Sequence, residues 1–334
     1  MEAAVLTGPE LIELLDVAEP SAGPGECLVR LRAVGICGTD LRIFDGSIPV
    51  AYPRVIGHEM VGEVVGVAGG GAVSGTRVVV DPSVVCGRCD RCREGRENLC
   101  LEGWLLGRDR DGGMAGFVAV PTGNVHPVPD ELEDGDATLI QVLTTCVHGQ
   151  RMCPIAANDS VAIVGLGVTG LLHLQLAKRA GAHPIVCTTR NVEKLELARS
   201  FGADALVPAG DPNAADRIRE ATGGGADVVI ESAGTVATLG RAVSIARYGG
   251  RILAYGTIAD KDGPFPFYDL YRKELVVTSP RAAIASDFGV AIDAVRSGDV
   301  RFDGLVTHRI PMREAAEALA TAAGSQALKV ILDI

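Results

Sequence analysis

The spacing of hydrophobic residues divides the chain into two regions. From residue 1 to about 145, short apolar runs rich in β-branched residues alternate with glycines, as in ECLVRLRAVGICG, MVGEVVGVAGGG and TRVVVDPSVV. Runs of this length, separated by turn residues, are typical of short β-strands that follow one another closely. We therefore predict a small β-barrel for the first region.

A different pattern begins near residue 158, where apolar strands alternate with helices. Strands are predicted for SVAIVG, PIVCTT, ADVVIES and RILAYGT, and helices for GLLHLQLAKRAG and NVEKLELARSFG. This alternation favours a parallel, doubly wound sheet, so the expected fold class is α/β. Further on, we predict a helix in SDFGVAIDAVRSG, a strand in VTHRI, a helix in MREAAEALATA and a closing strand in LKVILDI, which returns to the first region.

Composition narrows the class of protein. At roughly 150 residues per domain, a chain of 334 residues predicts two domains. No apolar run approaches the roughly 20 residues that cross a bilayer, and the beginning MEAAVLTGPELIELL lacks the features of a signal peptide, so we expect a cytoplasmic protein. Acidic residues outnumber basic ones by 42 to 31 without any Lys/Arg cluster. This balance argues against nucleic acid as a partner and favours a small-molecule substrate.

Four of the nine cysteines lie within one short segment, CGRCDRCREGRENLC. The spacing of Cys86, Cys89, Cys92 and Cys100 allows their thiolates to converge on one tetrahedral zinc ion. Four sulfur ligands close the coordination sphere, so this ion would stabilise the loop without taking part in catalysis. The alternative is two disulfides or four free thiols, which a reducing compartment and the tight spacing make less favourable.

A glycine motif, GLGVTG, follows an apolar strand and opens a helix. In such a place Gly165 permits a tight turn, Gly167 lets the backbone approach a pyrophosphate, and Gly170 lets the helix pack closely on its strand. The helix N-terminus then faces the phosphate charge. The alternative is that the glycines serve only the turn and the packing. The predicted dinucleotide-contacting segment is Gly165, Leu166, Gly167, Val168 and Gly170.

The end of the next strand predicts which dinucleotide binds. An NAD enzyme places Asp or Glu there, whereas this chain has Thr188, Thr189 and Arg190, with Lys194 one turn further on. A guanidinium without a neighbouring carboxylate suits the 2′-phosphate of NADP(H). Alternatively, Thr189 or Asn191 caps the following helix and Arg190 faces solvent. Where two later strands end, we expect further cofactor contacts, chiefly from the backbone, at Ser232, Ala233, Tyr255 and Gly256.

The first region also carries residue types of an open metal site, in the segments GICGTD and GHE. Thiolate, imidazole and carboxylate groups from Cys37, His58 and Glu59 can hold zinc while one position stays available for a substrate oxygen. Considered alone, a single His is more often a hydrogen-bonded polar residue, and a single Cys more often fills a core.

The chain resembles the zinc-containing medium-chain alcohol dehydrogenase family along essentially its whole length. The segments that carry the resemblance are GICGTD, GHE, the four-cysteine segment, GLGVTG and IESAG. Within that family, VTHRIP and KLELARSFGAD are most similar to the polyol, sugar and threonine dehydrogenase branch. The resemblance implies a discontinuous GroES-like catalytic domain at 1–145 and 284–334, and a Rossmann domain at 146–283. It further implies catalysis in a cleft, and a homodimer or homotetramer.

The same resemblance implies a role for each residue of the open site. Cys37 and His58 would bind the catalytic zinc, and Glu59 would be a ligand or a close neighbour of the ion. Asp40 would orient His58, and Thr39 would bond the substrate oxygen and pass on its proton. The implied reaction moves a hydride between a nicotinamide cofactor and an alcohol or carbonyl, with a polyol, amino sugar or cyclitol as substrate. The NADP(H) preference predicted from Arg190 favours carbonyl reduction as the direction.

Three further residues, Gln141, Arg42 and Arg281, are compared with the family at their positions. Gln141 stands where the family has a Cys or Glu ligand. Either water fills that position with Glu59 bound, or the metal is held more weakly than usual, or Gln141 bonds the substrate or the metal-bound water. Arg42 replaces a histidine that relays protons in many relatives, and an arginine cannot act as a base. It either binds an anionic substrate group or forms a surface salt bridge. Arg281 resembles an arginine near the zinc in some polyol dehydrogenases, although it could equally pair with a helix end.

Two other functions fit the same scaffold. One is an NADPH-dependent reductase of activated C=C or C=N bonds that does not use a catalytic metal. The other is a non-catalytic nucleotide-binding protein, which would leave Cys37, His58 and Glu59 unexplained. Two zinc ions per chain support the dehydrogenase, and one supports either alternative.

Overall fold

The computed structural model describes residues 1–68, 73–260 and 262–334, which form two compact units. The first unit comprises Met1–Thr144, Ile284–Arg296 and Phe302–Ile334, and the second comprises Thr145–Ala283 and Ser297–Arg301. The sequence placed residue 145 and the segment 297–301 in the first domain, whereas the structure assigns both to the second unit. The end of the predicted run MVGEVVGVAGGG lies outside the described residues.

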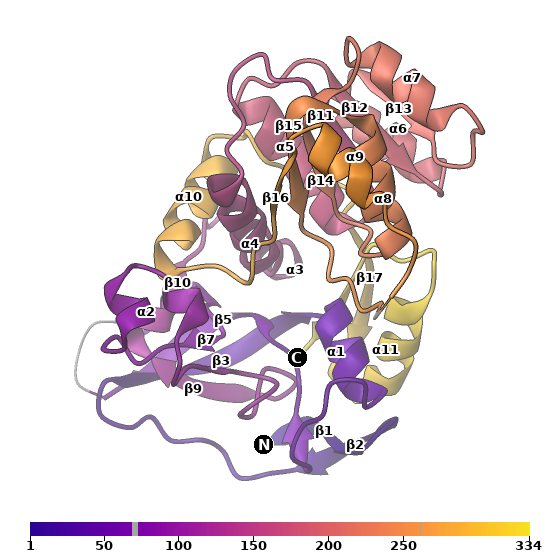
Figure 1. Cartoon of the computed structure of the whole chain (residues 1–334). Helices are drawn as coiled ribbons and strands as arrows, with labels where there is room; N and C mark the ends of the chain where they lie inside the picture. Colours follow the sequence, from indigo (N-terminus) through magenta and orange to yellow (C-terminus); the bar gives the residue numbers. More distant parts are fainter. Residues whose placement is uncertain (69–72, 261) are drawn as a thin grey trace. The chain divides into compact units, whose positions relative to one another are not determined.

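The larger sheet of the first unit has the strand order β10-β6-β5-β3-β18-β17, and β9 also pairs with β3 (Figure 1). Its central strand β3 pairs antiparallel with β5, β9 and the C-terminal strand β18, which brings the two ends of the sequence together. The strands are β3 (Glu26–Gly35), β5 (Glu59–Val67), β6 (Arg77–Val80), β9 (Phe117–Pro121), β10 (Val125–Pro127), β17 (Val306–Pro311) and β18 (Lys329–Asp333).

Shorter elements complete the first unit. Two small sheets have the orders β2-β1-β4 and β7-β8. Their strands are β1 (Glu2–Gly8), β2 (Leu11–Asp16), β4 (Arg54–Val55), β7 (Ser83–Val84) and β8 (Trp104–Leu105). The helices are α1 (Gly38–Phe44), α2 (Asp90–Arg93), α3 (Asp134–Ala137), α4 (Leu139–Met152, which continues into the second unit), α10 (Ala285–Arg296) and α11 (Ala315–Ala323), with 3-10 turns η1 (Glu97–Leu99), η2 (Thr122–Asn124) and η3 (Met312–Glu314).

Alternating side chains of β3 explain why the sheet forms around it. Val29 and Leu31 are buried in the core of the first unit, whereas Arg30 and Arg32, which follow each of them, are not. Such alternation is what a pleated strand with one buried face requires. The buried face continues into the loop that leads to α1, and this loop carries Cys37.

The second unit contains a parallel sheet with the order β13-β12-β11-β14-β15-β16, which confirms the predicted doubly wound fold. Helices α5 to α8 pack on its strands. The strands are β11 (Val161–Val164), β12 (Ile185–Thr189), β13 (Ala205–Pro208), β14 (Ala226–Glu231), β15 (Ala246–Ala254) and β16 (Val276–Thr278), and the helices are α5 (Val168–Arg179), α6 (Glu193–Ser200), α7 (Ala214–Ala221), α8 (Val236–Ile245) and α9 (Phe267–Arg272).

The sequence pattern did not single out β13, α7 or α8. These elements have four, eight and ten residues, so they are at least as long as β11 and α6, which the pattern did predict. They are stabilised by packing, because Val207, Ile218 and Val243 belong to one buried cluster with the central strands. None of the helices in the described segments has the length and apolar character to cross a bilayer.

Candidate active site and metal centres

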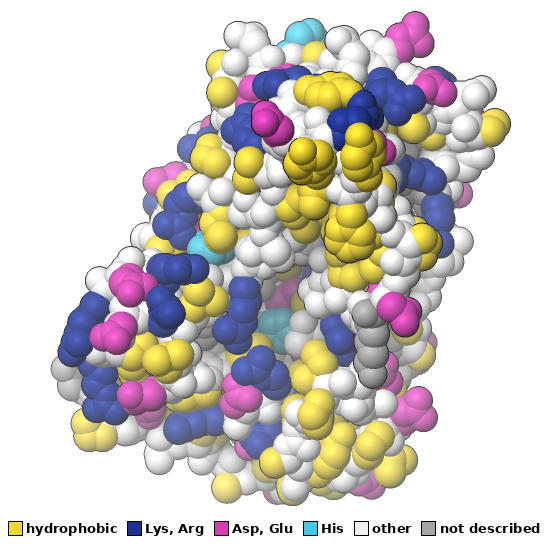
Figure 2. All heavy atoms as spheres, viewed as in Figure 1, with side chains coloured by type: hydrophobic (Ala, Val, Ile, Leu, Met, Phe, Trp, Pro, Cys, Tyr) yellow, Lys and Arg dark blue, Asp and Glu magenta, His cyan; other side chains and the backbone are white. Residues whose placement is uncertain are grey.

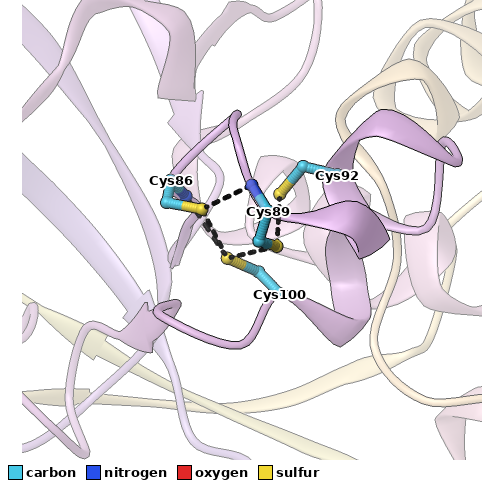
Figure 3. Close-up of side chains that lie close together, drawn as sticks. All are labelled: Cys86, Cys89, Cys92 and Cys100. Atoms are coloured by element: carbon cyan, nitrogen blue, oxygen red, sulfur yellow. Dashed lines mark hydrogen bonds between the residues drawn. The ribbon is translucent and has the colours of Figure 1, made fainter.

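The four cysteines of the first unit come together in the loop between β7 and β8, around α2 and η1 (Figure 3). The Sγ atoms of Cys89 and Cys92 are 3.5 Å apart, those of Cys86 and Cys100 3.5 Å, and those of Cys89 and Cys100 3.9 Å. Sulfurs bonded to one tetrahedral zinc ion lie about 3.8 Å from one another, given Zn–S bonds of about 2.3 Å. The donor set and its spacing therefore fit zinc.

Backbone hydrogen bonds favour the thiolate form of Cys89, whereas burial raises the pKa of the neighbouring Cys92 thiol to about 12. The backbone N–H of Cys86 donates to the sulfur of Cys100, and that of Cys89 donates to the sulfur of Cys86, each over 3.3 Å. Backbone donors at Leu101 and Cys92 lower the pKa of the Cys89 thiol to about 6. All nine cysteines are free, so the structure contains none of the disulfides considered above. With four sulfur donors, the cluster leaves no position for a substrate.

A second cluster joins Cys37, His58 and Glu59, whose ligand atoms all lie within 4.8 Å of one another. Cys37 is the N-cap residue of α1, while Glu59 opens β5 and His58 directly precedes it. Because β5 pairs with β3, the start of β5 lies beside the loop that leads from β3 into α1. One thiol, one imidazole and one carboxylate match the donor chemistry of a three-ligand zinc site.

Asp40 ties the two segments of this cluster together. Its fully buried carboxylate accepts hydrogen bonds from the backbone of Cys37 (2.8 Å) and of Gly57 (3.2 Å), and it lies 3.2 Å from Nδ1 of His58. Burial alone would lower the pKa of His58, yet Asp40 and Cys37 outweigh it and raise that pKa well above its usual value. The buried carboxylate and thiol beside His58 thus favour positive charge in this pocket.

Lys329, for which the sequence pattern predicts no role, contacts this cluster in the structure. Its buried ammonium donates to both carboxylate oxygens of Glu59. The sequence does contain a sign of this contact, since the lysine lies in the apolar closing strand LKVILDI. A charged residue in a buried strand requires a partner of opposite charge or hydrogen-bond acceptors. That partner is 270 residues earlier in the chain.

The remaining predicted residues of the reaction site occupy different environments. Thr39 and Arg42 are half-buried and lie three residues apart on α1, so their side chains emerge from the same face of the helix. Among the described residues Arg42 has no ion-pair partner within 4 Å. Gln141 is half-buried near the start of α4 in the first unit. Arg281 is exposed and belongs to the second unit, after β16.

The glycine motif of the second unit forms the turn between β11 and α5. Gly165 has a φ of +97°, and a Cβ at Gly170 would lie 2.0 Å from the carbonyl oxygen of Gly165. A Cβ at Gly167, by contrast, would meet nothing within 4 Å. Two glycines are therefore required by the turn and by packing, whereas Gly167 faces open space next to the N-terminus of α5. That space suits a pyrophosphate held against the helix.

The strand ends next to this turn hold it in place. The Ser232 hydroxyl donates to the carbonyl oxygen of Gly165 over 2.8 Å, and the hydroxyl of Tyr255 lies 2.6 Å from that of Thr145. The backbone N–H of Ala233 donates to the carboxylate of Glu231. Of these three bonds, that of Ser232 reaches the glycine turn itself. The expected cofactor contacts at Ser232, Ala233, Tyr255 and Gly256 stay a prediction.

At the end of β12, Thr188 is buried, Thr189 is half-buried and Arg190 is exposed. The side-chain oxygen of Asn191 accepts a hydrogen bond from the backbone of Glu193, so Asn191 takes the turn-forming role at the start of α6. Arg190 forms no ion pair with any residue that the structure describes. Burial lowers the pKa of the half-buried Lys194. The two cations are thus not committed to carboxylates.

The other histidines do not join either cluster within the described part of the chain. Burial lowers the pKa of His126 to about 4 and that of His173 to about 3, so both are neutral at physiological pH. His126 stacks on Phe288 at 4.3 Å, and His173 packs edge-on against Tyr255. These contacts match the structural roles expected from their spacing.

Comparison with known proteins places this geometry in a family. Residues 23–130 match the alcohol dehydrogenase GroES-like domain, and residues 168–297 match the zinc-binding dehydrogenase domain. The chain is 33% identical over 307 residues to L-galactonate-5-dehydrogenase of Escherichia coli K12, which covers 89% of this chain and 88% of that protein. The chain belongs to the zinc-dependent medium-chain dehydrogenase family. Within it, similarity to sorbitol and L-threonine 3-dehydrogenases supports the polyol, sugar and threonine branch.

Solved structures of dehydrogenases share the fold along the whole chain. A zinc-binding dehydrogenase from Sinorhizobium meliloti 1021 bound to NADP superimposes with a TM-score of 0.91 at 34% identity, covering 100% of this chain and 99% of that one. An alcohol dehydrogenase from Escherichia coli CFT073 in complex with NADH gives a TM-score of 0.92 at 30% identity, with coverage of 100% and 99%. The dehydrogenase described here is accordingly an oxidoreductase with GroES-like and Rossmann domains.

The four-cysteine cluster leads to a prediction about stability. Cys89→Ser should remove one zinc ion per chain and lower Tm by roughly 5 to 10 °C, because the loop loses the ion that closes it. Metal analysis and calorimetry measure the two effects. Cys153→Ser, at a buried cysteine of the second unit, is the control that should keep the full zinc content. An unchanged zinc content in Cys89→Ser would contradict a metal centre at this cluster.

Proposed function

We propose that this dehydrogenase transfers a hydride between NADP(H) and an alcohol or carbonyl substrate, with zinc held by Cys37 and His58. The observation that carries the proposal is the cluster of Cys37, His58 and Glu59, because it offers fewer protein donors than a closed zinc site. When bound there, zinc supplies Lewis-acid polarisation of the substrate oxygen. The four-cysteine cluster holds a second, structural zinc.

The residues around the cluster orient the imidazole, bind the substrate oxygen and affect the path of the proton. Asp40 engages Nδ1 of His58, so Nε2 is the nitrogen left to bind the ion. Thr39, two residues after Cys37, donates to or accepts from the substrate oxygen and passes its proton onward. Arg42 keeps its charge at all relevant pH values, so the proton leaves through ribose hydroxyls or water.

NADP(H) as the cofactor is supported by the end of β12. That position has no carboxylate to bind a ribose 2′-hydroxyl, and it offers Arg190 and Lys194 as uncommitted cations for a 2′-phosphate. The similar structure from Sinorhizobium meliloti contains NADP, and the one from Escherichia coli CFT073 contains NADH. The family therefore accommodates both cofactors, and the choice depends on these side chains.

The substrate in this proposal is a polar polyol, amino sugar or cyclitol, in line with the sugar-acid and polyol relatives. Arg42 favours, within that class, substrates that carry an anionic group. Its half-buried guanidinium has no ion-pair partner among the described residues and shares a helix face with Thr39, which bonds the reacting oxygen. A carboxylate or phosphate elsewhere on the substrate would be a suitable partner for it. The free state of all nine cysteines fits a reducing compartment such as the cytoplasm.

We further propose that the chain forms a homodimer or homotetramer through the outer edge of its parallel sheet. The edge strand β16 exposes Val276, and the neighbouring helix α9 exposes Phe267, Tyr268 and Tyr271 by more than two thirds of each side chain. In the space-filling view, hydrophobic side chains gather over the region labelled α9 in Figure 1 (Figure 2). An apolar patch beside an unpaired strand edge is typical of a subunit interface.

A screen of purified enzyme tests the reaction. We expect two zinc ions per chain and NADP-linked activity on at least one polyol, amino sugar, cyclitol, aldonate or polyol phosphate. Cys37→Ala should retain one zinc ion and lose at least roughly 1000-fold in kcat, since about 4 kcal/mol of transition-state stabilisation depends on the ion. Turnover of enones or imines with a single zinc would contradict the proposal, as would NADPH binding without any turnover.

Cofactor choice is tested at Arg190. Arg190→Ser should lower kcat/KM for NADP by roughly 10- to 100-fold, because a charge-assisted hydrogen bond contributes about 1.5 to 3 kcal/mol, and should change kcat/KM for NAD by less than about threefold. Gly167→Ala is the matched variant, since its methyl group meets only open space in the protein. It should weaken both nucleotides equally while Tm stays constant. A wild-type preference for NAD would refute the assignment.

The oligomer is tested by light scattering during size-exclusion chromatography. The wild-type chain should elute with two or four times the mass of one chain, and Tyr271→Asp should shift it toward the monomer because a charge enters an apolar contact. Leu11→Asp, at an exposed leucine of the first unit, should leave the mass unchanged. A wild-type monomer at micromolar concentration would exclude this interface.

A further inference from the structure

The first unit contains a cavity outside the metal clusters, bordered by β1, β4, β8 and β9. It has a volume of about 480 Å³, and all of its lining residues belong to the first unit. Pockets that bind small molecules range over ~300–1,000 Å³. Cys37, His58 and Glu59 are not among the lining residues, so the cavity is distinct from the proposed reaction site.

Most of the wall of this cavity is aliphatic. Val5, Leu106, Ala115 and Val118 line it, and each of them is nearly fully buried in the protein. The half-buried Val17, which follows β2, lines it from another side. An apolar wall favours a ligand with a hydrocarbon body, because contact between the two releases water from both surfaces.

Four charged side chains line the same cavity, and its two carboxylates already have donors. The carboxylate of Asp111 accepts hydrogen bonds from Nη1 of Arg54 and from a backbone N–H group, each over 3.0 Å. That of Glu26 accepts one from a backbone N–H group over 2.9 Å. The other two charged residues are Arg54 itself and Arg110.

These two arginines carry donors without acceptors. The Nε–H group of Arg54 is buried and has no hydrogen-bond partner in the part of the chain that the structure describes. A buried donor without a partner costs free energy, which an acceptor on a ligand would recover. The guanidinium of Arg110 lies 4.1 Å over the ring of Trp104 and has no carboxylate partner among the described residues. Stacking on an aromatic ring leaves the N–H groups at the edge of the guanidinium available to an anion.

We propose that this cavity binds a small aliphatic carboxylate, whose hydrocarbon body contacts the apolar wall and whose carboxylate accepts hydrogen bonds from Arg54 and Arg110. A carboxylate offers acceptors to both guanidiniums, and such charge-assisted bonds are stronger than bonds between neutral groups. The site goes beyond the proposed reaction, because it uses neither the metal clusters nor the nucleotide turn.

The loop 105–113 contacts both the cavity and the segment that carries His58. Part of this loop lines the cavity, and its glycines pack on the metal side. A Cβ at Gly107 would lie 2.6 Å from the carbonyl oxygen of Gly57, and one at Gly112 would lie 2.2 Å from the same atom. Since carboxylates also bind zinc, a test has to distinguish an acid in the cavity from an acid on the nearby metal.

Isothermal titration calorimetry of the zinc-loaded enzyme with decanoate tests the site. We expect one molecule per chain, bound at least roughly 10-fold more tightly than decanol, which lacks the charge, or acetate, which lacks the hydrocarbon body. Arg110→Ala should weaken decanoate binding roughly 10- to 100-fold, because charge-assisted hydrogen bonds are lost. Arg313→Ala, which removes an exposed arginine of the same unit, is the matched control and should keep the wild-type affinity.

Two further variants locate the bound acid. Val17→Trp should abolish binding, because the larger side chain fills the cavity that Val17 lines. Cys37→Ala should bind decanoate like the wild type, since the metal cluster takes no part. Loss of binding in Cys37→Ala would place the acid on the metal and overturn the inference. Wild-type affinity in Arg110→Ala, or equal affinities for decanoate and decanol, would overturn it as well.

A second copy of the chain is the other occupant to test. If decanoate does not bind and Val17→Trp lowers the mass of the oligomer in light scattering, a partner subunit covers the cavity and the inference fails. Absence of decanoate binding with an unchanged mass also refutes it. None of these measurements uses substrate or nucleotide, so their outcome is independent of the activity screen.

Discussion

The buried negative charge around Cys37 is the constraint on which the first unit depends. Moving a carboxylate out of water costs several kcal/mol unless a cation or hydrogen-bond donors replace the water. Asp40 is satisfied by two backbone N–H groups and His58, whereas Glu59 is satisfied by the ammonium of Lys329. The sulfur of Cys37 and the imidazole of His58 lie beside these groups, and their donor chemistry suits a divalent cation such as zinc. The chemistry of the site thus follows from how its charges are balanced.

Strand pairing brings the charged groups of this cluster together. β3 carries Gly35 at its end and places β5 and the C-terminal strand β18 on either side, so residues from the beginning and the end of the chain meet around one carboxylate. In the second unit, glycines likewise determine where the predicted dinucleotide can bind. There the absence of side chains at Gly165 and Gly170 lets a strand, a turn and a helix approach closely, while Gly167 leaves space for a phosphate. In both units, a glycine determines where a polar group can lie.

The two metal clusters differ in how readily the sequence reveals them. Cys86, Cys89, Cys92 and Cys100 lie within fifteen residues, so local chain geometry alone brings the sulfurs together, and the spacing was sufficient to predict the cluster. Cys37 and His58 are separated by a helix and a strand, so their proximity was expected only from resemblance to a known family. The cluster observed in the structure does not depend on that resemblance.

The sequence by itself determined the α/β class, the doubly wound sheet, the glycine turn and the four-cysteine loop, because each of these arises from residues close together in the chain. It did not reveal β13, α7 and α8, which are stabilised by packing against the central strands. Only the tertiary structure decided that Lys329 contacts Glu59 and that the side chain of Asn191 accepts a hydrogen bond from Glu193, the first residue of α6. A buried charge has to have a partner, but the sequence does not say which one, since strand pairing can bring together residues that are 270 positions apart.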